Sequence, residues 1–217
     1  IDEKLFYDLE RIEEKDDPII DEIKMGQEEK KHVILYYEHV QESIPLFQPL
    51  DKLSSQLDPR ILQGLKNYGF GKGLLPFQEK SFNAILTGDN TVISAPTGSG
   101  KTEAFTVPII QKICKKNYPK GVFALLVYPL RALARDQVIK ISKLIRDCNL
   151  ENEIEAFPIL GGMDPKTVSD RIETTKRKSV IIATNFDFIN RHLTLVDTKW
   201  QNLCKPAKVV VMDELHS

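Results

Sequence analysis

A glycine-rich octapeptide carries the clearest chemical signal in the sequence. Ala95-Pro96-Thr97-Gly98-Ser99-Gly100-Lys101-Thr102 directly follows the apolar run 91–94. Glycines let a backbone turn so that successive N–H groups point at phosphate oxygens, and a helix that begins near Lys101 adds the positive end of its dipole. A lysine here reaches the outer phosphates of a nucleotide, and the Thr102 hydroxyl is a ligand for Mg²⁺. The octapeptide therefore predicts a phosphate-binding loop.

Two carboxylates near the end of the sequence have the chemistry that such a loop requires. Asp213 and Glu214 directly follow the apolar run 209–212. Asp213 is placed to hold Mg²⁺ through water, and Glu214 to orient and deprotonate a water that attacks the terminal phosphate. An apolar run with two acids after it is often a plain strand end. With a phosphate loop upstream in the same predicted sheet, it predicts Lys101, Asp213 and Glu214 as catalytic residues.

The elements that must position these residues alternate between strand and helix. We predict strands at 91–94, 122–128, 154–160, 180–183 and 208–212, with helices of roughly 12 to 18 residues between them. All but the third read as strands that are buried on both faces. This alternation predicts an α/β fold with a mostly parallel, doubly wound sheet, in which ligands bind beyond the carboxyl ends of the strands.

The first part of the chain has a different texture. Residues 1 to about 40 show helical spacing of apolar positions and hold 12 acidic and 6 basic residues within the first 31. A second helix is predicted to start at Asp58-Pro59 and end near Gly69, because Asp is a good N-cap and Pro suits the first turn. Another helix is predicted after Leu75-Pro76. We expect the acidic segment either to act as an autoinhibitory or partner-binding segment or to pack as a helix on the following domain.

Composition sets the broad class of the protein. The 217 residues are 41% hydrophobic and 28% charged, with a formal net charge of −1, which is the balance of a globular domain. No apolar run approaches the roughly 20 residues of a membrane span, and the start of the chain is charged. The three cysteines form no CxxC pair, so neither a zinc site nor a disulfide framework is predicted. We expect an intracellular protein, cytoplasmic or nuclear, without a membrane partner.

Several segments together resemble the superfamily 2 DExH-type helicases. The octapeptide matches their motif I, in which Ala is common at the first position, and residues 213–216 (DELH) match motif II. Residues 128–137 (YPLRALARDQ) resemble motif Ia, and the combination is most similar to the large-helicase-related DNA helicases. The resemblance implies a RecA-like P-loop NTPase domain at 57–217, with a mostly parallel sheet flanked by helices. Residues 1–56 would form a charged helical N-terminal extension.

The resemblance also implies binding roles for individual residues. Gln78 corresponds to the glutamine that reads adenine, and its amide offers the donor and acceptor that adenine requires. The predicted nucleic-acid contacts are Pro129, Arg131, Gly161, Gly162, Thr184 and Asn185. Each also has an ordinary interpretation: Gln78 as a surface side chain, Arg131 as a solvated cation, the two glycines as a turn and Thr184 as a helix N-cap.

The resulting functional hypothesis is an ATP-dependent helicase or translocase, with ATP and Mg²⁺ as cofactors. DNA is favoured over RNA as the nucleic acid because motif II ends in His. The family places ATP between two RecA-like domains, and the sequence stops one residue after motif II, so we expect nucleotide binding with very slow hydrolysis and no unwinding. The alternatives are a DNA-translocating motor of a defence or restriction system, a nucleotide-dependent nucleic-acid-binding scaffold and, least favoured, a small-molecule kinase.

Overall fold

The computed structural model describes residues 47, 49–50, 56–96, 98–115, 118, 120–191 and 198–213. The compact unit that contains them spans residues 45–217. The helix predicted over residues 1 to about 40 lies outside the described residues. Leu50, which the sequence analysis assigns to the N-terminal extension, is buried in the main core. Among the described helices, none is long and apolar enough to cross a membrane.

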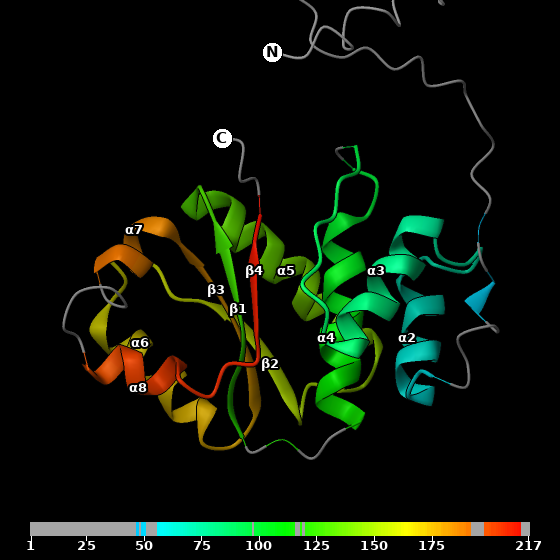
Figure 1. Ribbon diagram of the computed structural model, residues 1–217. Helices are drawn as coiled ribbons and strands as arrows, with labels where there is room; N and C mark the ends of the chain where they lie inside the picture. The colour runs from blue at the N-terminus through cyan, green and yellow to red at the C-terminus, as the bar shows by residue number, and fades with distance from the viewer. Residues whose placement is uncertain are drawn as a thin grey trace, which may run out of the picture. The chain divides into compact units, whose positions relative to one another are not determined.

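A four-stranded parallel sheet forms the centre of the fold (Figure 1). Its strands are β1 (Gly121–Tyr128), β2 (Ile154–Pro158), β3 (Ser179–Asn185) and β4 (Val209–Met212), in the order β2-β3-β1-β4. Val127 pairs with Thr184 on one side and with Met212 on the other. The carboxyl ends of these three strands therefore lie side by side, and the predicted α/β class with a mostly parallel sheet is confirmed.

Helices cover both faces of the sheet and enclose two hydrophobic cores. The larger core lies against α2 (Pro59–Tyr68), α3 (Pro76–Thr87), α4 (Lys101–Lys115) and α5 (Arg131–Asp147). The smaller core lies against α6 (Pro165–Thr175), α7 (Phe186–Ile189) and α8 (Thr198–Cys204) on the opposite face (Figure 1). β1 and β3 are central strands with apolar side chains on both faces, so their sequences are continuous apolar runs rather than alternating ones.

The predicted helix starts are confirmed. α2 begins at Pro59, and the Asp58 carboxylate caps it by accepting a hydrogen bond from the Arg60 N–H at 2.9 Å. The helix ends at Gly69, whose φ of +123° suits glycine. α3 begins at Pro76, directly after Leu75. Local cap and proline chemistry therefore marks these boundaries in the sequence.

The strand predicted at 91–94 is wrong. The segment pairs with no described strand, and Val92 is 96% exposed. A cavity of about 590 Å³ separates it from β4, so its β-branched residues have no neighbouring backbone within hydrogen-bonding reach. β4 itself is an edge strand with Val210 and Met212 about half exposed, so the prediction that it is buried on both faces is also wrong.

Candidate functional site

The predicted phosphate loop has the backbone that phosphate binding requires. Gly98 and Gly100 have φ values of +76° and +90°, a region that residues with a Cβ rarely adopt. A Cβ on Gly100 would also lie 2.4 Å from the Gln78 Nε2 atom. α4 starts at Lys101, so the loop leads directly into a helix N-terminus with its free N–H groups. Thr97 lies outside the described residues.

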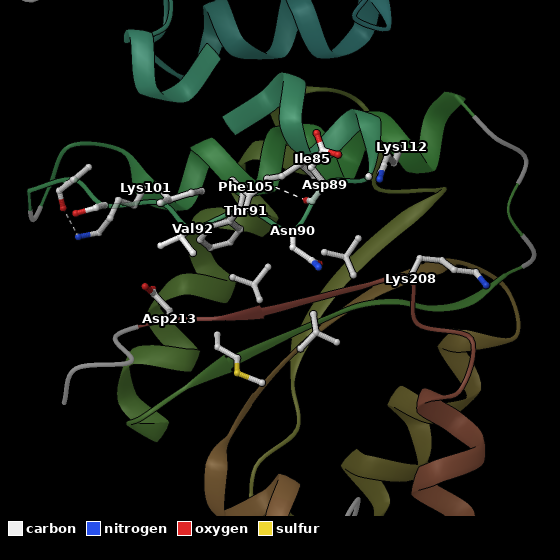
Figure 2. A pocket seen from close by; sticks show the side chains of 18 residues that line it. Ile85, Asp89, Asn90, Thr91, Val92, Lys101, Phe105, Lys112, Lys208 and Asp213 are labelled. Atoms are coloured by element: carbon white, nitrogen blue, oxygen red, sulfur yellow. Dashed lines mark hydrogen bonds between the residues drawn. The ribbon is translucent and has the colours of Figure 1, made fainter. Parts of the chain in front are cut away.

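Lys101 and Asp213 line the same cavity, the one between residues 91–95 and β4 (Figure 2). Lys101 Nζ donates a hydrogen bond to the Ala95 carbonyl oxygen at 2.7 Å, which holds the side chain across the loop. An ammonium group carries three protons, so two more remain for phosphate oxygens. The structure thus brings a motif I cation and a motif II carboxylate to one cavity from segments more than one hundred residues apart.

Two oxygen donors near this cavity fit a magnesium ion. Asp213 lines the cavity with its carboxylate, and Thr102, the residue after the cavity-lining Lys101 in α4, offers a hydroxyl. Hard oxygen ligands are those that Mg²⁺ prefers. Among the described residues, no three His, Cys, Asp or Glu side chains gather as a metal cage. Mg²⁺ at nucleotide sites is typically held by one or two protein groups together with phosphates and water, so a sparse donor set suits a nucleotide-bound ion. Glu214 lies outside the described residues.

The Thr102 hydroxyl has a partner that the sequence analysis did not assign. Its Oγ1 lies 2.8 Å from Oε1 of Gln137, a buried residue on α5. Gln137 is the last residue of the motif Ia segment, so its position was visible in the sequence. Its contact was not, because the two residues are 35 positions apart and only the packing of α4 and α5 brings them together.

A second cavity, of about 500 Å³, is lined in part by Gly98, Ser99 and Gly100 of the phosphate loop. Its lining includes Tyr68, Phe70, Gln78, Gly100 and Glu103. The two aromatic rings are stacked, with centroids 6.1 Å apart and an interplanar angle of 11°. Flat aromatic faces next to a phosphate loop provide a stacking surface for a nucleotide base. Tyr68 and Glu103 had no assigned role in the sequence analysis.

Gln78 is buried and joins the loop to α3. Its Oε1 accepts from the Leu75 N–H at 2.9 Å, and its Nε2 donates to the Gly100 carbonyl oxygen at 3.1 Å. The interpretation as a solvated surface glutamine is therefore wrong, because the side chain is only 2% exposed. Contact with adenine remains a prediction, and the second N–H of the amide is the group that would make it.

Tyr68 contacts two charged side chains. Its hydroxyl donates to Glu103 Oε1 at 3.2 Å, and the Lys143 ammonium lies 4.3 Å from the ring centroid. Burial, with a smaller contribution from the Glu103 carboxylate, raises the pKa of Tyr68 to about 12. The phenol therefore stays protonated and keeps donating to Glu103 at physiological pH.

Three of the predicted nucleic-acid contacts lie together. The Arg131 guanidinium is 3.3 Å from the position that a Cβ on Gly161 would occupy and 3.9 Å from that on Gly162. Arg131 is exposed at the start of α5, and Pro129 precedes it at the end of β1. The glycines follow β2. The Arg131 side chain, which follows β1, and the backbone of the two glycines, which follow β2, thus form one surface at the carboxyl edge of the sheet.

Thr184 and Asn185 do not join this exposed surface. They are 1% and 2% exposed, because they belong to the central strand β3 between β2 and β1. Within the described part of the chain, Thr184 Oγ1 and Asn185 Oδ1 have no hydrogen-bond partner. Asn185 Nδ2 donates to Asp187 at 3.2 Å. Their contact with nucleic acid stays a prediction, and their side chains are covered in this structure.

Tyr128 lies beside the acidic end of the site. It pairs with Asn185 across the sheet, and its hydroxyl is buried. Burial, together with the Asp213 carboxylate, raises the pKa of Tyr128 well above its usual range. The tyrosine is therefore neutral throughout the physiological range.

Comparisons with known proteins give the site a family context. The family model described as DEAD/DEAH box helicase matches residues 75–217. The uncharacterized ATP-dependent helicase YprA of Bacillus subtilis is 28% identical over 165 residues, which are 76% of this chain and 21% of that protein. The chain thus spans about a fifth of the length of this relative.

Two solved structures share the fold. The helicase MrfA, bound to DNA and AMPPNP, has a TM-score of 0.65 at 28% identity over 81% of this chain and 23% of that one. The DEAD-box helicase Mss116, bound to ssRNA and UDP-BeF, has a TM-score of 0.66 at 25% identity over 79% of this chain and 34% of that one. Because all three relatives are helicases, a helicase domain is favoured over the alternative functions considered above.

Proposed function

Because the chain belongs to the DEAD/DEAH box helicase family, we propose that its 57–217 region is the ATP·Mg²⁺-binding motor half of a helicase that acts on DNA. The observation that carries the nucleotide part is the shared cavity of Lys101 and Asp213 beside the glycine loop. Lys101 would neutralise the outer phosphates of ATP, and Thr102 and Asp213 would hold Mg²⁺, which supplies further charge neutralisation for phosphoryl transfer. The base would stack in the cavity lined by Tyr68, Phe70 and Gln78.

The exposed surface of Arg131, Gly161 and Gly162 supports the nucleic-acid part of the proposal. The guanidinium presents donors that suit the phosphate backbone, and the glycines allow another backbone to approach closely. Such contacts grip the strand without reading its sequence. DNA is proposed over RNA on the motif resemblance and on MrfA, whose structure contains DNA, although Mss116 contains ssRNA. Unwinding or translocation by the whole protein is part of the same proposal, together with a second RecA-like domain and an intracellular location.

Replacing Arg131 with Ala is expected to weaken binding of single-stranded DNA about tenfold. The reason is the loss of one charge-assisted phosphate contact, worth roughly 1.5–3 kcal/mol before solvent screening. Because one phosphate contact is lost, the slope of log K against log salt should also fall by about 0.7 for a single strand. Fluorescence anisotropy with a labelled oligonucleotide at several salt concentrations measures both quantities.

Arg177→Ala is the matched control for this experiment. Arg177 is also an exposed arginine, but it precedes β3 and so lies at the amino edge of the sheet. Its replacement should leave both affinity and salt slope within about a factor of two of the unaltered chain. Equal losses for the two variants would show that the chain binds DNA through diffuse charge rather than through the Arg131 surface. Repeating the titration with RNA of the same sequence tests the preference for DNA.

A further inference from the structure

The hydrogen bond between Thr102 and Gln137 has a defined direction. Gln137 Oε1 lies 2.8 Å from Thr102 Oγ1, and an amide oxygen only accepts hydrogen bonds. The hydroxyl proton of Thr102 therefore points at Gln137, and both lone pairs of Oγ1 point elsewhere. A hydroxyl that donated to no fixed group would rotate freely, and its proton would occupy some of the directions that a cation requires.

Gln137 is placed to hold this arrangement rigidly. It is 7% exposed and belongs to the middle of α5, between Ala134 and Ile141, which are buried in the larger core. Thr102 lies in the first turn of α4. The hydrogen bond thus joins the start of the helix that follows the phosphate loop to a second helix whose own position is fixed by packing. Little side-chain entropy remains to be lost when a metal binds to Thr102.

From this geometry we infer that Gln137 is a positioning residue for the magnesium ligand Thr102. The inference rests on the proposed function, because it requires that Thr102 meet Mg²⁺ when nucleotide binds. By accepting the hydroxyl proton, Gln137 fixes the side-chain rotamer of Thr102 and increases the negative charge on Oγ1, which improves it as a ligand for a hard cation. If Gln137 had only a structural role, its hydrogen bond to Thr102 would stabilise the packing of α4 against α5 and would not affect magnesium binding.

The test compares nucleotide affinity with and without magnesium. Gln137→Met keeps the length and burial of the side chain and removes the acceptor. In the chain of residues 1–217, a fluorescent ATP analogue is titrated in Mg²⁺ and again in EDTA. We expect the variant to lose about tenfold of the affinity gained from Mg²⁺, the scale on which groups behind a metal ligand act. Its affinity in EDTA should stay within about a factor of two. Gln137→Glu, which retains an acceptor oxygen, should keep most of the magnesium gain.

Gln111→Met is the matched control. Gln111 is a buried glutamine of α4, 1% exposed, and its Oε1 accepts from the Asp58 N–H at 2.7 Å, away from Thr102. Its replacement should lower the melting temperature without changing the magnesium gain. If the two variants lower the melting temperature alike and only Gln137→Met changes the magnesium gain, loss of folding does not explain the effect.

A double-mutant cycle with Thr102→Val decides whether Gln137 acts through Thr102. In the valine background, Gln137→Met should have no further effect on the magnesium gain. An equal loss in both backgrounds, or a Gln137→Met variant with the full magnesium gain, would overturn the inference while the proposed function stands. Failure of the unaltered chain to bind the analogue at all would overturn the proposed function and this inference with it.

Discussion

Lys101→Ala is expected to reduce the affinity of the chain for ATP·Mg²⁺ by about 10- to 100-fold. Hydrogen bonds to charged groups contribute roughly 1.5–3 kcal/mol, and every 1.4 kcal/mol is about a factor of ten in affinity. In the structure the ammonium already reaches across the loop to the Ala95 carbonyl oxygen, so it is held where the phosphates would lie. Isothermal titration calorimetry with ATP in Mg²⁺ measures the change.

Lys112→Ala is the control for charge alone. Lys112 lines the same cavity, but it belongs to the far end of α4 and lies well away from Lys101 (Figure 2). Both variants remove one positive charge from the cavity wall. If the phosphate loop is the site, Lys112→Ala should change the affinity by less than about twofold. A comparable loss in the two variants would mean that ATP binds by general electrostatic attraction, and the assignment of the loop would fall.

Gly100→Ala is expected to have the second large effect, a loss of ATP affinity of at least about tenfold. A residue with a Cβ that is held at a φ of +90° costs on the order of 1–3 kcal/mol, and the new methyl group would lie 2.4 Å from Gln78 Nε2. To relieve both, the loop must change the direction of its N–H groups, and those groups are what the phosphates bind. The melting temperature and ATP affinity are measured on the same preparation.

The double variant Gln78→Ala/Gly100→Ala separates the two causes. Removing the Gln78 amide removes the close contact but leaves the strained φ of residue 100. Compared with Gln78→Ala alone, the added Gly100→Ala change should still lower ATP affinity, because backbone strain remains. Full recovery on removal of Gln78 would show that the contact alone matters. Unchanged affinity in the Gly100→Ala single variant would contradict the loop geometry described above.

Local chemistry explains which parts of the fold were predictable. The Asp58-Pro59 helix start has a local signal in its Asp N-cap and first-turn proline, and the phosphate loop has one in its glycines and following helix, so both are visible in the sequence. The strand at 91–94 was wrong because an apolar β-branched run describes only the segment itself. A strand also requires a neighbouring backbone, and the described chain provides none there.

The site was predictable where its residues are consecutive and less so where packing assembles it. Lys101 and Asp213 were paired because both were predicted to follow strands of one sheet. The segment before Lys101 is not a paired strand, but the structure still places both residues at one cavity. The partner of Thr102 was missed because Gln137 meets it only through helix packing. Thr184 was predicted as an accessible hydroxyl. It belongs to the central strand β3, whose side chains are buried on both faces of the sheet.

The most direct test of the central claim is a calorimetric titration of the unaltered 217-residue chain with ATP, performed once in Mg²⁺ and once in EDTA. The account predicts one nucleotide bound per chain, with clearly tighter binding in Mg²⁺, because Lys101 and the glycine loop bind the phosphates and Thr102 and Asp213 bind the ion that accompanies them. Absence of binding in Mg²⁺, or an affinity that is the same in EDTA, would contradict it.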